Sequence, residues 1–313
     1  MIVQGLGAIG AGLLRAAHAD PRFDVVGAVD VAPALAGRLL AELTGSGPAR
    51  ITVKPTLEAA LAAAPGAEVL LHATGSKLHE IAPHLEDAIR RGLHVVSTCE
   101  ELSWPWDRHP DLARRLNEAA RAAGRTLLGT GVNPGFVMDR LAVTVASACC
   151  GVRGVSVWRL VDPRPRRPQF QKKVGFGLER DDWEALVISG RAGHIGLPES
   201  ARLVAAGLGW TIPHWTERFE PLAPDPEGPI SGILQMMEGA TADGRTIRLR
   251  FEAHAGITRS EDRIDVDGTP PVHLRIDGGV SGDAATHAAV LHAAHLLAAA
   301  PRGLVTVLDL PLR

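Results

Sequence analysis

Two adjacent glutamates, Glu100 and Glu101, are the clearest candidates for acid–base chemistry in the sequence. They follow the apolar run Leu93–Thr98, which predicts a buried strand, and ligands bind beyond the carboxyl ends of such strands in parallel sheets. A carboxylate there can accept a proton, stabilise a developing positive charge and activate a water molecule. Adjacent side chains point to different sides, so we expect one of the two to face the reacting groups. Glu100 is nearer the strand end, Glu101 is the alternative, and a solvated pair of surface carboxylates is the competing interpretation.

A glycine turn near the start of the chain predicts a dinucleotide site. Residues 5–10 read GLGAIG, between the apolar run Met1–Gln4 and an apolar-periodic stretch that continues to His18. In a strand–turn–helix unit the first glycine permits the tight turn, the second lets the backbone approach a pyrophosphate, and the third lets the helix lie close to the strand. The N–H groups at the helix start face the phosphates. The cofactor residues predicted here are Gly5, Gly7, Ala8, Ile9 and Gly10.

Asp30 bears on which dinucleotide would bind. It ends a second predicted strand, Asp24–Val29, twenty residues after Gly10. A carboxylate at this position binds the adenosine ribose diol and repels a 2′-phosphate, which favours NAD. Arg38 lies close in sequence and keeps NADP open.

Alternating apolar runs and helical segments continue to residue 129 and predict a parallel sheet covered on both faces. We expect strands at Ile51–Val53, Glu68–Ala73, Leu93–Thr98 and Thr126–Gly129, and helices at Ala34–Leu43, Thr56–Ala64, Leu78–Arg91 and Asp111–Ala123. The loops after these strands would therefore meet at one edge. Thr74, Gly75 and Ser76 are predicted to contact ribose or pyrophosphate, although Ser76 is equally suited to cap the next helix.

Asn133 lies in the loop that follows the strand Thr126–Gly129. Its amide is suited to hold the nicotinamide carboxamide or a substrate nitrogen, while Pro134 stiffens the loop and Gly135 allows close approach. The alternative is that Asn133 caps a helix over Phe136–Ala148, and both roles are compatible.

The second half of the chain changes to a β pattern. Strands are expected at Val155–Val161, Thr216–Leu222, Ile233–Ala240, Arg245–Ala253 and Val272–Ile276, and helices at Asp181–Ser189, Glu199–Leu208 and Asp283–Ala299. The predicted fold is therefore α/β: a Rossmann-type doubly wound parallel sheet plus a second α+β domain with a mainly antiparallel sheet. We expect the dinucleotide domain at 1–134, with 283–313 packing back on it, and a substrate-binding and dimerisation domain at 135–282.

Composition excludes several classes of function. The chain of 313 residues has 33 Lys and Arg and 35 Asp and Glu, which gives a net charge of −2. It therefore lacks the excess of positive charge that binding to nucleic acid or to an anionic membrane requires. No run approaches the length of a membrane span, and three cysteines without a Cys/His cluster predict neither a disulfide framework nor a metal site. We expect a reduced, cytoplasmic protein. The absence of tyrosine excludes reductases that protonate a carbonyl with a Tyr–Lys pair.

Several motifs together resemble the 2,4-diaminopentanoate dehydrogenase family, which includes the native amine dehydrogenases. They are STCEE at 97–101, GVNPGF at 131–136, QKKVG at 171–175 and PRGL at 301–304. The resemblance implies an architecture like that of dihydrodipicolinate reductase. It also implies NAD(P)-dependent oxidative deamination of an amine, or reductive amination of a ketone or aldehyde with ammonia. A catalytic glutamate in the STCEE segment and a homodimer joined through the second domain are further implications.

The substrate pocket is expected to be apolar, because a chain without tyrosine must line it with other side chains. The residues predicted to line it are Phe136, Val137, Trp158, Gln171, Phe176 and His254. Such a pocket favours a simple amine or ketone. A diamino acid would need a cation for its carboxylate, for which Arg159, Arg166 and Lys173 are the candidates. Two other interpretations stay open: a related oxidoreductase acting on a C=C or C=O bond, and a non-catalytic NAD(H)-binding sensor.

Overall fold

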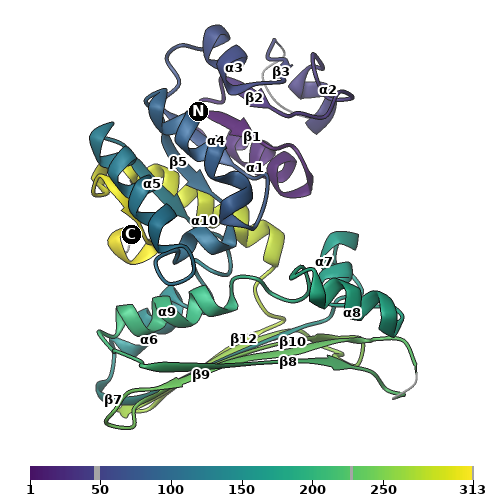
Figure 1. The fold of residues 1–313 in the computed structure, drawn as a ribbon, viewed down its shortest axis with the longest axis vertical. Coiled ribbons are helices and arrows are strands. Elements are labelled where there is room, and N and C mark those ends of the chain that lie inside the picture. Colours follow the sequence, from purple (N-terminus) through teal and green to yellow (C-terminus); the bar gives the residue numbers. More distant parts are fainter. Residues whose placement is uncertain (46–49, 226–227, 312–313) are drawn as a thin grey trace. The chain divides into compact units, whose positions relative to one another are not determined.

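Two compact units make up the computed structural model, which describes residues 1–45, 50–225 and 228–311 (Figure 1). Unit 1 comprises Met1–Phe136 and Ser281–Arg313, and unit 2 comprises Val137–Val280. From the sequence, the first part of the dinucleotide domain was expected to end at residue 134 and its C-terminal part to begin at residue 283. Each unit has its own sheet and is described by itself.

Unit 1 is built on a seven-stranded parallel sheet with the order β13-β6-β5-β4-β1-β2-β3. From β1 the chain proceeds to β2 and β3 on one side and then returns to β4, β5 and β6 on the other. This reversal creates a topological switch point between β1 and β4, where ligands bind in doubly wound sheets. The predicted fold class is confirmed. The strands are β1 (Ile2–Gln4), β2 (Gly27–Val29), β3 (Val53–Lys54), β4 (Val69–His72), β5 (His94–Ser97), β6 (Thr126–Gly129) and β13 (Gly303–Val305).

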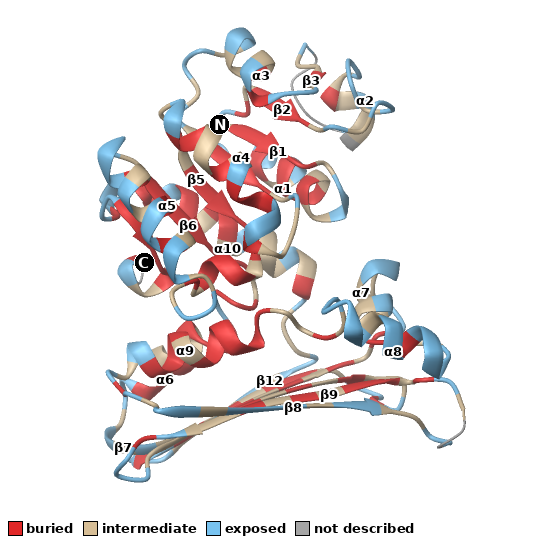
Figure 2. Ribbon diagram, in the orientation of Figure 1, coloured by how far each residue is buried: buried red, intermediate tan, exposed pale blue. Residues whose placement is uncertain are grey.

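α4 and α5 are amphipathic and bury their apolar residues, while other residues of the same helices are exposed (Figure 2). The core between sheet and helices includes Leu70, Leu85, Val95 and Leu116. The Thr56 hydroxyl accepts a hydrogen bond from the Ala59 N–H and caps α3. The helices are α1 (Ala8–Ala19), α2 (Leu40–Thr44), α3 (Leu57–Ala63), α4 (Leu78–Arg90), α5 (Pro110–Ala122) and α10 (Gly282–Leu296), with short 3₁₀ turns η1 (Glu100–Ser103), η2 (Leu297–Ala299) and η3 (Val307–Asp309).

The helix predicted over Ala34–Leu43 is wrong. Gly37 has a φ of +78° and its N–H bonds to the carbonyl of Val53, so the backbone pairs with β3 where the helix was expected. A bridge between Leu39 and Thr52 continues this pairing, and α2 begins only at Leu40. In this segment the backbone pairing with β3 outweighs the helix propensity of the alanines.

Unit 2 is built on a six-stranded sheet with the order β12-β11-β7-β10-β9-β8. All neighbours are antiparallel except β7 and β10, so the mainly antiparallel sheet is confirmed. The strands are β7 (Cys150–Val161), β8 (His214–Leu222), β9 (Gly232–Ala240), β10 (Thr246–His254), β11 (Glu261–Thr269) and β12 (Val272–Asp277), and the helices are α6 (Arg140–Ala146), α7 (Pro168–Lys173), α8 (Arg180–Ile188) and α9 (Leu197–Gly207). β11 and α7 were not predicted.

One face of this second sheet is covered by helices. α6 packs on β7 and β11, and α9 packs on β9 and β10. Along the inner strands, alternate residues are buried on that face, for example Val155 and Val157 in β7 and Leu249 and Phe251 in β10. The opposite face carries Trp158 and many charged side chains. The alternation of inward and outward residues therefore separates the candidate residues of this unit into two groups.

The helix predicted over Phe136–Ala148 is shorter than expected. α6 begins at Arg140 because the buried carboxylate of Asp139 accepts the Arg140 N–H and acts as N-cap. Cys149 and Cys150 lie beyond α6, and Cys150 is exposed at the start of β7.

In the described part of the chain, no helix combines the length and the apolar character needed to cross a membrane. Nor do the described residues bring together three or more His, Cys, Asp or Glu side chains in a way that would bind a metal ion.

Candidate active site

The predicted site residues of unit 1 gather at one edge of its sheet. Beyond the strand ends, backbone hydrogen bonds join each loop to its neighbour: Gly5 N–H to Val29, Ala73 N–H to Gln4, Thr98 N–H to His72, and Thr130 N–H to Ser97. The glycine turn, the loop after β4, the glutamate pair after β5 and the Asn133 loop after β6 therefore follow the strand order along this edge.

The glycine turn fits a dinucleotide phosphate group. Gly5 has a φ of +86°, and a Cβ there would lie 2.6 Å from the carbonyl oxygen of Ala73. A Cβ on Gly10 would lie 1.6 Å from the carbonyl oxygen of Gly5, so α1 can lie this close to the turn only with glycine. A Cβ on Gly7, the N-cap of α1, would meet no described atom within 4 Å, so the surface of the turn is open there. An open turn at a helix N-terminus without an acidic first turn is a suitable cradle for phosphates.

Asp30 is held in a defined orientation beside this turn. One carboxylate oxygen accepts the Leu6 N–H at 2.6 Å and the other accepts the Ala32 N–H at 2.8 Å. The carboxylate is therefore fixed between the turn after β1 and the loop after β2. This is the position from which it can accept hydrogen bonds from a ribose diol.

Glu101 has a structural role that its sequence position did not reveal. It is only 4% exposed, and its carboxylate accepts hydrogen bonds from the Leu78 N–H at 2.7 Å, His109 Nε2 at 2.9 Å and Arg108 at 3.1 Å. Burial raises the pKa of Glu101, but these donors, led by the Leu78 N–H, outweigh it and hold the pKa below its usual value. Glu101 thereby stabilises the N-terminus of α4.

Glu100 lies at the first position of η1, three residues after Ser97 at the end of β5, and is partly exposed. Its neighbour Cys99 is buried, and its thiol donates to the carbonyl of Ser76, while burial raises the pKa of that thiol. η1 packs so closely on β6 that a Cβ on Gly129 would lie 2.6 Å from the backbone of Leu102. The backbone that carries Glu100 is therefore fixed on both sides.

The loop after β4 was predicted at Thr74, Gly75 and Ser76. Ser76 does not cap α4: the N-cap position belongs to Lys77, and the Leu78 N–H is satisfied by Glu101. Ser76 instead contributes its carbonyl, which accepts the Cys99 thiol and the Glu101 N–H. This ties the loop after β4 to the glutamate pair after β5.

The Asn133 loop is compact and buried. Asn133 is 8% exposed, Gly135 has a φ of +130°, and a Cβ on Gly135 would clash with the Thr130 hydroxyl. The Val132 N–H donates to Thr286 of α10, which fixes the loop from the other side. The expectation that Asn133 caps α6 is wrong, because Asp139 is the cap.

The residues predicted to line a substrate pocket lie in different structural surroundings within their units. Phe136 is 40% exposed in unit 1, whereas Val137 is fully buried in unit 2. Trp158 lies on the sheet face opposite the helices, where Arg263 packs over its ring at 5.6 Å. Phe176 lies in the turn after α7, which packs on the helix-covered face, so within unit 2 Trp158 and Phe176 belong to opposite faces of the sheet.

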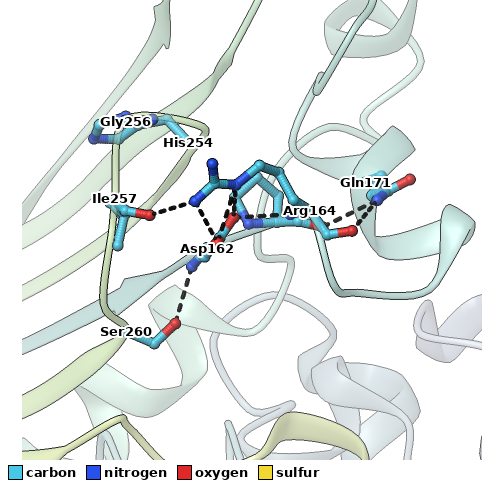
Figure 3. Close-up of polar contacts among 8 residues, drawn as sticks. Asp162, Arg164, Gln171, His254, Gly256, Ile257 and Ser260 are labelled. Carbon is cyan, nitrogen blue, oxygen red and sulfur yellow. Dashed lines mark hydrogen bonds and ion pairs between the residues drawn. The ribbon is translucent and has the colours of Figure 1, made fainter.

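Gln171 and His254 are engaged in local structure (Figure 3). The Gln171 amide donates to the carbonyls of Pro163 and Arg164, close to the ion pair between Arg164 and Asp162. His254 Nε2 bonds to Glu252 at 2.9 Å and its Nδ1 accepts the Gly256 N–H at 3.0 Å. Both ring nitrogens of His254 are thus used within the hairpin region, which favours a structural role.

An aromatic cluster that the sequence did not single out lies on the helix-covered face. Phe170 of α7 meets Phe251 edge-on at 6.4 Å between ring centroids, and the His194 ring lies 5.2 Å from Phe251. Arg166 packs over the Phe170 ring at 4.5 Å. Among the cations considered for a substrate carboxylate, Arg159 is buried and held by both oxygens of Asp262, so it is committed to the core.

The doubly wound sheet, the open glycine turn and the fixed Asp30 define unit 1 as the dinucleotide-binding part of an oxidoreductase. A family model described as "2,4-diaminopentanoate dehydrogenase C-terminal domain" matches residues 136–313. The chain belongs to this family, and the resemblance inferred from the sequence is confirmed. A curated relative, 2,4-diaminopentanoate dehydrogenase from Acetoanaerobium sticklandii, is 24% identical over 99% of this chain and 93% of its own length.

Solved structures share the fold over nearly the whole chain. An amine dehydrogenase from Mycobacterium smegmatis is similar with a TM-score of 0.85 and 21% identity, covering 99% of this chain and 95% of that one. GenD2 from gentamicin A biosynthesis, solved with NAD, gives a TM-score of 0.56 and 23% identity over 88% of this chain and 71% of that one. An oxidoreductase from Agrobacterium radiobacter, solved with NAD⁺, L-tartaric acid and magnesium, gives 0.63 and 12% identity over 98% and 91%.

Proposed function

We propose that this protein is an NAD(P)-dependent amine dehydrogenase that aminates a ketone or aldehyde with ammonia and catalyses the reverse oxidative deamination. The proposal is supported by membership of the 2,4-diaminopentanoate dehydrogenase family and by the dinucleotide site of unit 1. The observation that carries the mechanism is the division of the glutamate pair. Glu101 is buried and committed to Leu78, Arg108 and His109, whereas Glu100 is partly exposed at the start of η1, and we assign the chemistry to Glu100.

A bound nicotinamide would exchange hydride with the carbon that carries the nitrogen. Glu100 is proposed to take the proton from the substrate ammonium, since only the neutral amine can release hydride from its carbon. Glu100 passes this proton to solvent, so that it is a carboxylate again when the cationic iminium forms, and its negative charge then stabilises that group. In the last step Glu100 takes a proton from the water that attacks the iminium carbon and delivers it to the nitrogen of the resulting amino alcohol. Ammonia then leaves as the carbon–nitrogen bond breaks, and the remaining hydroxyl proton is released as the carbonyl forms.

Asp30 supports NAD as the preferred cofactor. Its two oxygens are already oriented by the Leu6 and Ala32 N–H groups, so it cannot turn away from a ribose that enters beside the glycine turn. A 2′-phosphate would bring like charge against this carboxylate.

The Phe170–Phe251–His194 cluster is proposed to contact the apolar part of the substrate, in place of the set predicted from sequence. Phe170 is partly exposed, while Phe251 is 3% exposed and holds it in place. Arg166, stacked on Phe170, favours a second candidate substrate class: a diamino acid whose carboxylate would pair with this guanidinium. Phe170→Ala is expected to raise KM for the organic substrate without changing NADH affinity.

We further propose that the protein forms a homodimer and that it is located in the cytoplasm. The uncovered face of the second sheet carries the half-buried ring of Trp158 among charged side chains of both signs, which suits a self-complementary contact between copies. Sedimentation velocity would give a monomer mass if this is wrong.

A screen of NADH and NADPH consumption with ammonia and a panel of ketones and aldehydes tests the function. Ammonia-dependent turnover supports an amine dehydrogenase. Ammonia-independent turnover would indicate a carbonyl reductase, and NADH binding without turnover would indicate a sensor.

A further inference from the structure

A buried histidine lies at the end of β4, beside the cofactor turn, and the proposed reaction does not use it. His72 is 0% exposed. Its Nδ1 lies 2.9 Å from the hydroxyl of Ser97, its register partner on β5, and its Nε2 lies 2.8 Å from the hydroxyl of Thr74. His84 of α4 is more distant from Nε2, at 3.5 Å. A polar chain thus runs through the sheet interior to the loop after β4.

The direction of the hydrogen bonds that join Ser97, His72 and Thr74 follows because the buried Ser97 hydroxyl proton needs an acceptor. The Ser97 hydroxyl oxygen accepts the Cys99 N–H at 3.1 Å, and Ser97 is 0% exposed. Among the described residues, the acceptor within reach of the Ser97 hydroxyl proton is His72 Nδ1. Nε2 must then carry the ring proton and donate it to Thr74.

The ring stays in this neutral form at physiological pH. Burial, followed by the effect of His84, lowers the pKa of His72 to about 3. Only one ring nitrogen is therefore protonated, and the Ser97 hydroxyl determines which one.

The tautomer of His72 determines where Thr74, at the exposed end of this series of hydrogen bonds, directs its own hydroxyl proton. The Thr74 oxygen receives a hydrogen bond from His72, so its own proton must be directed elsewhere. Thr74 is exposed, and its methyl group lies against the glycine turn, 2.9 Å from where a Cβ on Gly5 would stand. Its hydroxyl is thus held beside the surface on which a dinucleotide would lie.

We propose that Ser97 and His72 are positioning residues that orient the Thr74 hydroxyl as a hydrogen-bond donor to an oxygen of the bound nicotinamide dinucleotide. This inference rests on the proposed cofactor site and adds a directional relay to it. In the absence of the relay, the Thr74 hydroxyl could turn inward and donate to the ring, and the cofactor would lose a donor.

A double-mutant cycle on the full chain tests the relay, with NADH affinity measured by fluorescence titration. Thr74→Val removes the donor and is expected to weaken NADH binding about tenfold. Ser97→Ala releases the ring to its other tautomer and is expected to weaken it about threefold to tenfold. The double variant should bind like Thr74→Val alone, because Ser97 acts only through Thr74. Ser147→Ala, which removes a hydroxyl contact at the C-terminal end of α6 in unit 2, is the control and should bind like wild type.

Three results would overturn the relay. Wild-type affinity in Thr74→Val would show that its hydroxyl meets no cofactor oxygen. Effects of the two substitutions that multiply would show that Ser97 acts independently of Thr74. If the wild type does not bind NADH, both the proposed function and the relay are contradicted. The first two results contradict the relay alone and leave the proposed function intact. His72→Phe, with thermal melting to establish folding, should match Ser97→Ala or exceed it.

Discussion

Glu101→Gln is expected to reduce stability and to leave the chemistry in place. The wild-type carboxylate is buried and accepts three hydrogen bonds, of which the one from Arg108 is weakened by solvent because that side chain is 43% exposed. Glutamine keeps one acceptor oxygen, loses the charge and presents an NH₂ group that cannot accept. Since a hydrogen bond to a charged group contributes about 1.5–3 kcal/mol, losing one to two of them should cost about 1.5–6 kcal/mol of unfolding free energy.

The pH dependence of this loss follows from the lowered pKa of Glu101. Because the folded-state pKa lies below the unfolded one, the stabilisation is fully present above the unfolded value, about 4.3, and disappears as pH falls through the folded value. Urea unfolding of wild type and Glu101→Gln should therefore differ most at pH 7 and converge as the pH falls through the folded-state pKa of Glu101. Folded Glu101→Gln should still turn over. Unchanged stability combined with lost turnover would refute the assignment and make Glu101 the reacting carboxylate.

Three further substitutions test separate parts of the structure. Gly10→Ala forces a Cβ against the Gly5 carbonyl at 1.6 Å and should weaken NADH binding at least about a hundredfold in a fluorescence titration; unchanged affinity would contradict the proposed phosphate cradle. Asp30→Ser should shift the ratio of NADH to NADPH efficiency toward NADPH by about tenfold or more, and an unmoved ratio would show that Asp30 does not meet the ribose. Asp262→Asn leaves the buried Arg159 without its anion and should cost about 3–5 kcal/mol in urea unfolding, a cost that a surface pair would not approach.

The sequence predicted unit 1 well because its strands are continuous apolar runs that end in glycine or polar loops. It missed β11 in unit 2 for a physical reason. Glu261–Thr269 alternates acidic residues with apolar ones, and Asp262, which reads as a surface residue, is buried against Arg159 of the neighbouring β7. A buried ion pair between strands about a hundred residues apart has no local signature.

The candidate site was predictable to the level of loops but not of individual side chains. Parallel topology alone placed Thr74, Glu100 and Asn133 at one edge. The choice between Glu100 and Glu101 depended on Leu78, twenty-three residues away, whose N–H holds Glu101. His72 read as one more residue of a buried strand, since its pairing with Ser97 follows only from the register of β4 and β5.

Glu100→Gln tests the central claim most directly. The measurement is ammonia-dependent NADH consumption with the best ketone or aldehyde from the screen, together with NADH affinity of the same preparation. Loss of turnover by at least about a hundredfold, with NADH affinity and melting temperature unchanged, is the predicted result. Turnover at the wild-type rate would contradict the account, because the carboxylate at the end of β5 would then take no part in the reaction.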